Sequence, residues 1–213
     1  MRALTPLEAR ALGVLIEKQH TVPDTYPLSL NALVSGCNQK TARDPVIEAT
    51  DAEVLTAVDG LKGLSLVFEG SSSRVVKFEQ NLGRVLHLPS QAVALLAVLM
   101  LRGPQTAAEL RLNCERLHRF ADISSVEGFL DELATKEPPR VVKLARAPGA
   151  REARWAHLLC GEVAAPAWQP SAGGADVSAG ELAALKAEQT RLATELDSLK
   201  ALVQRMAQEL GIH

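Results

Sequence analysis

The sequence predicts a mainly α-helical protein of the α+β class: two tandem winged-helix domains with small β-hairpin wings, followed by a C-terminal coiled-coil helix. Three observations lead to this prediction: regularly placed helix-start signals, an order of helices and strands that occurs twice, and a leucine heptad pattern near the end of the chain. The apolar fraction is 47 per cent but the aromatic fraction only 3 per cent, which favours cores built by alanine-rich and leucine-rich helices. The predicted segments are domain 1 (1–84), domain 2 (85–162), a flexible linker (163–177) and the coiled-coil helix (178–213).

The helix starts carry capping boxes, in which a hydroxyl side chain accepts a bond from a free backbone N–H and a glutamate three residues later returns one. Pro6, directly after the first of these caps, suits the first helical position. Five onsets follow from this pattern: Thr5-x-x-Glu8, Thr50-x-x-Glu53, Thr106-x-x-Glu109, Ser124-x-x-Glu127 and Ser178-x-x-Glu181.

The first half then divides into elements by the spacing of its apolar residues. Helices are expected because leucine, valine and isoleucine recur at three- and four-residue intervals, and strands where they alternate with polar residues. The expected elements are a helix at 5–19, an extended piece at 20–27, helices at 28–37 and 51–62, and a hairpin of 64–70 and 74–80 around Ser71–Ser73. This order is typical of a winged helix.

The same order returns in the second half. Leu33–Cys37 matches Leu110–Cys114, and the helix expected at 124–136 corresponds to that at 51–62. The second hairpin is expected from 140–146 and 151–159, around a tip at 147–150. A period of about 80 residues favours two whole domains over a solenoid of short repeats.

Beyond a Pro-, Gly- and Ala-rich stretch, apolar residues alternate at spacings of three and four through four heptads, with Gln189 at one a position. This pattern is typical of a coiled coil, and a polar a position sets register in parallel dimers. It predicts a homodimer, with packing of the helix back onto its own chain as the alternative. The candidate dimerisation residues are Leu182, Leu185, Gln189, Leu192, Leu196, Leu199, Val203, Met206 and Leu210.

Several function classes find no support in the sequence. The cysteines Cys37, Cys114 and Cys160 are far apart, which argues against a disulfide framework and a zinc site. The phosphate-binding, dinucleotide-binding, zinc-protease and serine-hydrolase motifs do not occur, and the five histidines are scattered. We therefore expect no enzyme, no catalytic residue, no cofactor and no metal. The lack of a signal peptide or a long apolar run leads us to expect a cytoplasmic protein without membrane contact.

The stretch from 10 to 46, above all EKQHTVPDTYPLSLNAL followed by CNQK, closely resembles the signature of the YceH-like bacterial family of unknown function. The similarity continues to about residue 160. The resemblance implies a tandem winged-helix fold, and it brings no established substrate, cofactor or catalytic residue.

Two functions follow from the residues. The leading interpretation is a dimeric regulator that contacts the backbone of double-stranded DNA mainly through its basic wings. Its candidate residues are Lys40, Arg43, Arg74, Lys77, Lys143, Arg146, Arg151 and Arg154. The other is an adaptor that binds a protein partner through its winged-helix surfaces and binds no DNA. The formal net charge of −2 and the carboxylates of the helices at 51–62 and 124–136 weigh against DNA. The basic wing residues also have a plainer explanation as solvated charges at strand edges.

Overall fold

The first half of the chain consists of three helices and a small sheet, and the computed structural model describes residues 1–70, 75–146 and 152–163. Thr5 and Thr50 form the expected capping boxes, with both the hydroxyl and the returning glutamate in place. The elements are α1 (Pro6–Thr21), the short 3-10 helix η1 (Pro23–Thr25), β1 (Leu28–Ser29), α2 (Leu30–Cys37), α3 (Asp51–Gly63), β2 (Val67–Gly70) and β3 (Lys77–Gln80).

These three strands form one antiparallel sheet in the order β1-β3-β2. Leu28 pairs with Phe78, and Val67 pairs with Gln80. Residues 28 and 29 were expected to open the second helix, but they form β1 because Ser29 is the N-cap of α2 and has an extended backbone. The phenol oxygen of Tyr26 accepts a hydrogen bond from the Gln80 backbone at 2.7 Å, which ties the segment before β1 to the end of β3.

The second half repeats this order after α4, a short helix that the sequence analysis did not predict. Gln105 and Trp155 form an isolated antiparallel bridge at the place in the order that β1 occupies in the first half. The elements are α4 (Leu82–Leu86), α5 (Ser90–Arg102), α6 (Ala107–Asn113), α7 (Ile123–Thr135), β4 (Val141–Lys143) and β5 (Trp155–His157). Thr106 forms the expected capping box of α6.

The expected cap at Ser124 is wrong. The N-cap of α7 is Asp122, whose carboxylate accepts from the Ser125 backbone N–H at 2.7 Å and from the Ser125 hydroxyl at 2.6 Å. An aspartate carboxylate is a strong N-cap, and the hydrogen bonds to Ser125 hold the pKa of Asp122 below its ordinary value. The cap therefore lies two residues earlier than expected, and the helix begins at Ile123.

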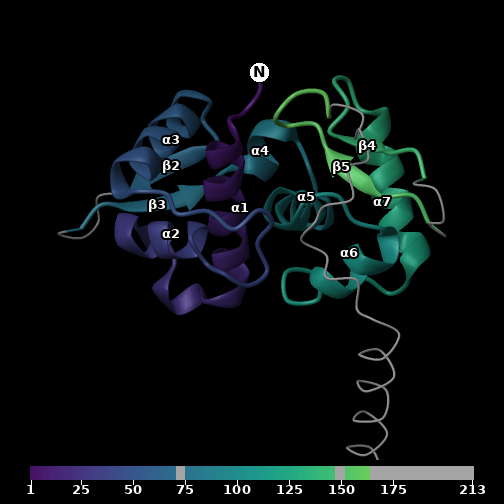
Figure 1. Ribbon diagram of the computed structural model, residues 1–213, viewed down its shortest axis with the longest axis horizontal. Helices are drawn as coiled ribbons and strands as arrows, with labels where there is room; N and C mark the ends of the chain where they lie inside the picture. The colour runs from purple at the N-terminus through teal and green to yellow at the C-terminus, as the bar shows by residue number, and fades with distance from the viewer. Residues whose placement is uncertain (71–74, 147–151, 164–213) are drawn as a thin grey trace, which may run out of the picture. The chain divides into compact units, whose positions relative to one another are not determined.

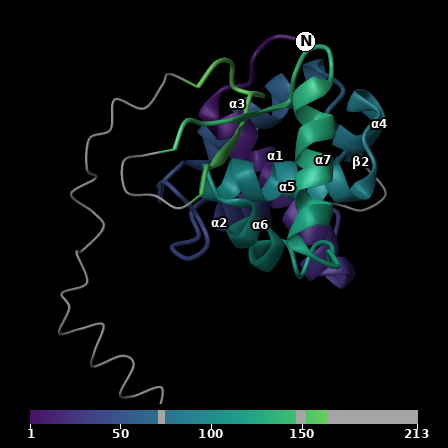
Figure 2. The same cartoon turned by 90° about the vertical axis from the view of Figure 1, so that its right-hand side faces the viewer.

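A single hydrophobic core joins the two halves. It contains buried side chains of α1, α2 and α3 together with those of α5, α6 and α7, and α1 packs more extensively against α5 than against any other element. Figure 1 shows α1 and α5 next to each other in the middle of this unit, and Figure 2 shows α7 in front of α5. The predicted boundary at residue 84 lies within α4. The α+β class is confirmed, and all described residues belong to one compact unit.

Candidate interaction surfaces

The exposed face of α3 carries carboxylates and an apolar side chain. Val54 and Leu61 are fully buried and fix which side of the helix faces the core. Asp51, Leu55 and Asp59 lie on the exposed side, with 40 per cent of Leu55 accessible. The helix therefore presents a surface that repels phosphates and offers apolar contact area.

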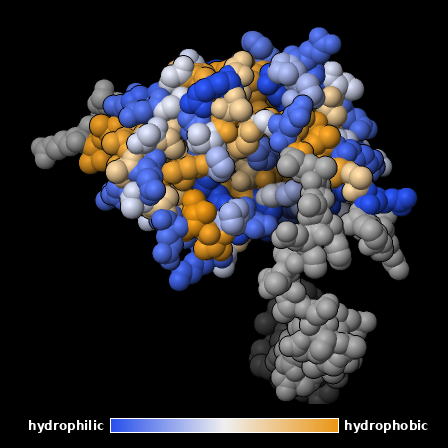
Figure 3. Space-filling model, turned by 45° about the horizontal axis from the view of Figure 1, so that its top comes forward, coloured by the Kyte–Doolittle hydropathy of each residue, from blue (hydrophilic) through white to orange (hydrophobic). Residues whose placement is uncertain are grey.

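A groove of about 540 Å³ runs between α3 and the first hairpin, here called the α3–hairpin groove. Leu55 on α3 lines it together with Val75 and Val76, which are 56 and 44 per cent exposed just before β3. Figure 3 shows hydrophobic side chains gathered beside the tip of this hairpin. The full lining is Ser29, Leu30, Asn31, Leu55, Asp59, Lys62, Glu69, Val75, Val76 and Phe78.

Among the described residues that line this groove, the one cation, Lys62, is held by two carboxylates. Lys62 binds Asp59 at 3.2 Å and also pairs with Glu69 across to β2. Its hydrogen bond to Glu69, followed by that to Asp59, raises the pKa of the Lys62 ammonium. Because Lys62 is paired with both Asp59 and Glu69, its single positive charge leaves the surface acidic.

The second hairpin is more basic, although carboxylates lie among its cations. Lys143 lies 5.3 Å from the centre of the Trp155 ring in a cation–π contact. Arg154 donates to the Pro104 carbonyl at 2.8 Å and pairs with Glu109 at 3.1 Å. Lys143 and Arg146 line a shallow hollow together with Ala107, Ile123, Glu127, Glu152, Ala153 and Trp155.

The described candidate DNA-binding residues lie in several different elements. Lys40 is exposed in the loop after α2, whereas Lys77 is half-buried in β3. Lys143, Arg146 and Arg154 belong to the second hairpin. Arg74, Arg151 and all nine candidate dimerisation residues lie outside the described residues.

Arg43 is a correction to the predicted set, because its side chain is completely buried and paired with a carboxylate of α1. Its guanidinium donates to Glu17 at 3.1 and 2.6 Å and to the Gly36 carbonyl at 3.1 Å. Burial acts to raise the pKa of Glu17, but the hydrogen bonds and charge of Arg43 outweigh it and lower that pKa. Arg43 thus ties the loop after α2 to α1 and is not available to a phosphate.

His157, in β5, is a largely buried imidazole whose Nδ1 has no hydrogen-bond partner within the described part of the chain. Burial lowers its pKa from 6.5 to about 4. At neutral pH the side chain is therefore uncharged.

This shift predicts that His157 contributes to acid destabilisation. Between pH 6.5 and about 4 the unfolded chain binds a proton on His157 while the folded chain does not. The free energy of unfolding therefore falls as pH decreases through that window.

Urea unfolding at several pH values should show a shallower fall of this free energy for His157→Phe than for the wild type. The carboxylates with lowered pKa, such as Glu17, are common to both proteins and cancel in the comparison. Parallel pH profiles would contradict the prediction.

Within residues 1–70, 75–146 and 152–163, no group of three or more His, Cys, Asp or Glu side chains is arranged to hold a metal ion. No helix in this part of the chain is long and apolar enough to cross a membrane. Its cysteines are all free, with Cys37 and Cys114 buried.

A family model described as a protein of unknown function, DUF480, matches residues 4–150. A UPF0502 protein of Burkholderia multivorans is 72 per cent identical over 214 aligned residues, which cover 100 per cent of this chain and 91 per cent of that protein. A UPF0502 protein of Burkholderia pseudomallei is 70 per cent identical over the same shares. One of Paraburkholderia xenovorans is 70 per cent identical over 100 per cent of this chain and 90 per cent of its own length.

These matches agree with the resemblance to the YceH-like family that the segment from 10 to 46 carries. The family model covers both halves of the described structure as far as the second hairpin. This chain therefore belongs to the DUF480 family of proteins of unknown function.

Proposed function

We propose that the protein is a non-enzymatic, cytoplasmic regulatory adaptor of two winged-helix domains, which binds another protein through the α3–hairpin groove. The repeated order of helices and strands and the β1-β3-β2 sheet support the winged-helix assignment. A homodimer formed by the heptad segment from 178 to 213 remains part of the proposal.

The observation that carries the proposal is the exposed side of α3 together with the hairpin beside it. In a winged helix that reads DNA, the third helix enters the major groove and presents Arg, Lys, Asn or Gln to the bases. Here the equivalent helix presents Asp51, Leu55 and Asp59, and its Lys62 is held by two carboxylates. Desolvated apolar side chains ringed by charge are characteristic of protein–protein contacts.

The charge of the groove indicates the kind of partner. In the described part of its lining, Asp59 and Glu69 stand against a single cation, and Asp51 extends the acidic face along α3. The complementary partner is a protein segment that presents two or three apolar side chains flanked by Lys or Arg.

The test is affinity capture by the full-length protein from extracts of the organism that makes it, with and without nuclease treatment. The Leu55→Asp/Val76→Asp variant should lose a partner that the wild type retains, because it places two carboxylates on the apolar floor. Leu112→Asp/Val22→Asp, which changes two other exposed apolar residues, should retain that partner. The purified partner should then bind the wild type at least about tenfold more tightly than the groove variant. Cross-linking should place its basic segment beside α3.

The proposal fails if both double variants retain the same proteins with equal affinity. It also fails if the retained species is nucleic acid that nuclease removes. That second outcome would favour a DNA-associated regulator, for which the exposed Lys143 and Arg146 of the second hairpin are the specific observation. Loss of the nucleic acid in Lys143→Glu/Arg146→Glu, but not in Arg84→Glu, would then locate the contact on that hairpin.

A further inference from the structure

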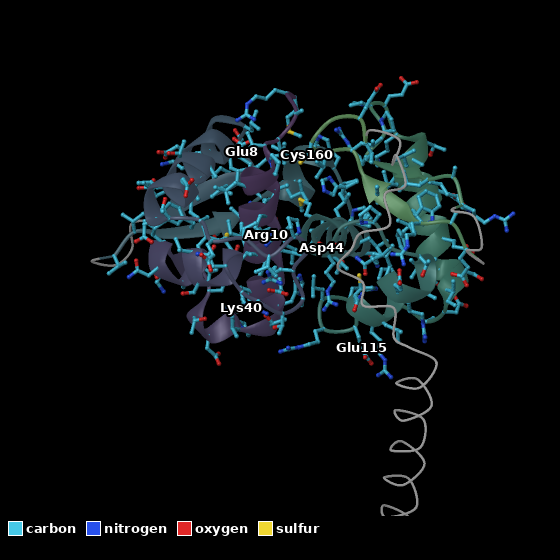
Figure 4. All side chains as sticks on the ribbon, viewed as in Figure 1. Glu8, Arg10, Lys40, Asp44, Glu115 and Cys160 are labelled. Carbon is cyan, nitrogen blue, oxygen red and sulfur yellow. The ribbon has the colours of Figure 1, made fainter. Side chains whose placement is uncertain are left out.

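Another hollow lies where the two halves meet, and nothing in the proposed function uses it. It measures about 530 Å³, within the range of small-molecule sites. It is here called the interhalf cavity, and residues from α1, the loop before α3, the end of α5 and the segment from β5 onward line it. Figure 4 shows Arg10, Asp44 and Cys160, which belong to this lining, between the two halves.

The walls of the interhalf cavity are largely apolar. Leu7 comes from α1, Ile47 from the loop before α3, Met100 from α5 and Ala156 from β5. These four side chains belong to segments far apart in the sequence, so an occupant would contact both halves at once. Its apolar body would remove surface of both halves from water.

The rim of the cavity is acidic. Asp44, Glu48 and Glu162 are exposed lining residues, and none of the three carboxylates has a hydrogen bond or an ion pair with any described residue. A fourth lining carboxylate, Glu53, accepts bonds from Thr50 in the capping box of α3. Low-dielectric walls beside several like charges focus a negative potential into the cavity.

The cations of the lining offset only part of this charge. Arg10 is 4 per cent exposed and interacts electrostatically with Asp44, and its two terminal nitrogens donate to the Cys37 carbonyl at 3.1 Å and the Pro45 carbonyl at 2.7 Å. In the described part of the lining, this single cation lies among four carboxylates. His157 is uncharged at neutral pH because burial lowers its pKa to about 4. The lining therefore has an excess of negative charge at its solvent-facing edge.

We propose that the interhalf cavity binds a small organic cation, with its apolar body against Leu7, Ile47 and Met100 and its ammonium group at the carboxylate rim. The carboxylates at the rim attract the positive charge of the ligand. The apolar walls contact its hydrocarbon chain or aromatic ring. Because the occupant contacts α1 and α5 together, it stabilises the packing of one half on the other and links ligand binding to the stability of the whole unit.

The test uses three probes that share one apolar body and differ in charge: 4-phenylbutylamine, 4-phenylbutanol and 4-phenylbutyrate. Isothermal titration calorimetry with the full-length protein at low salt should show the amine binding about tenfold more tightly than the alcohol. The acid should bind more weakly than the alcohol. The amine alone should raise the unfolding temperature appreciably.

Two matched variants locate the binding. Asp44→Asn/Glu48→Gln/Glu162→Gln removes three rim charges at exposed positions and should weaken amine binding about tenfold, to the level of the alcohol. Glu115→Gln/Asp131→Asn/Glu132→Gln removes the same number of exposed carboxylates outside the cavity lining and should leave amine binding unchanged.

Three outcomes would overturn the proposal. Tighter binding of the acid would show that the buried Arg10 dominates the potential. Equal loss in both triple variants would show attraction by overall charge. Failure of the full-length protein to bind any probe would show that the cavity is not a ligand site.

Discussion

Replacing Glu17 with alanine is expected to destabilise the protein by about 3–5 kcal/mol, because it leaves a buried guanidinium without its counterion. The Arg43 side chain is fully buried, and Glu17 is the carboxylate that pairs with it. Its remaining bonds, to the carbonyls of Gly36 and Ala42 and to the side-chain oxygen of Gln39, do not neutralise the charge. Urea unfolding of the wild type and of Glu17→Ala measures the difference.

A double-mutant cycle separates the charge from the packing. Arg43→Met alone should also destabilise, since Glu17 would lose its main partner and keep only Lys18 at 3.4 Å. Glu17→Leu/Arg43→Met should recover much of the loss, because apolar side chains of similar volume can replace a buried ion pair. If Glu17→Ala lowers the free energy of unfolding by less than about 1 kcal/mol, the prediction is wrong. The pair would then contribute no more than an ordinary surface salt bridge.

Shortening Leu101 to alanine is expected to cost about 2–5 kcal/mol, the usual range for a buried leucine. Leu101 is 2 per cent exposed in the last turn of α5. It lies against Gly13 of α1: a Cβ added to Gly13 would be 3.0 Å from Leu101 Cγ. The substitution therefore opens a void at the contact between the two halves.

Gly13 provides the matched partner for this test. Gly13→Ala alone would crowd Leu101, and the Ala97 carbonyl at 3.4 Å leaves the new methyl group little room. In the Gly13→Ala/Leu101→Ala protein the new methyl group occupies part of the void. The double variant should therefore lose less stability than the sum of the two single changes. Additive losses would show that the two positions do not share one contact.

The same experiment tests whether the segments 1–84 and 85–162 fold as separate domains. The buried core includes side chains from both halves, so we expect the described unit to unfold in one transition in the wild type and in Leu101→Ala. Two separate transitions, observed by tryptophan fluorescence and by circular dichroism, would instead show that each half is stable by itself.

The helices were predictable because their signals are local. Thr5, Thr50 and Thr106 each carry the capping glutamate three residues later, and the structure confirms all three caps. The α7 start was missed because Asp122 and Ser124 compete as caps within one turn, and spacing alone does not decide between them. The five-residue helix α4 has no side-chain cap hydrogen bond, and it therefore offers no start signal.

The candidate surfaces were less predictable, because they depend on residues far apart in the chain. Arg43 lies in a polar loop and has the character of a surface residue, yet its partner Glu17 is 26 positions earlier. The α3–hairpin groove unites residues from 29 to 78, and the interhalf cavity unites residues from 6 to 163. The acidic character of α3 could be predicted from the sequence. That Leu55 is exposed and lines the same groove as Val76 could be learned only from the folded structure.

The start of the described chain meets its far end. The Leu4 N–H donates to the Leu159 carbonyl at 2.8 Å, and the Cys160 thiol lies 3.8 Å from the Thr5 carbonyl. A circularly permuted gene, with residue 163 joined to residue 1 through a short polar bridge and new ends in the turn from 87 to 89, would leave every described helix and strand unbroken. A tag placed before Met1 would lie next to residues 159–161 and could disturb that contact. A label intended to leave the contact intact therefore belongs in the turn from 87 to 89.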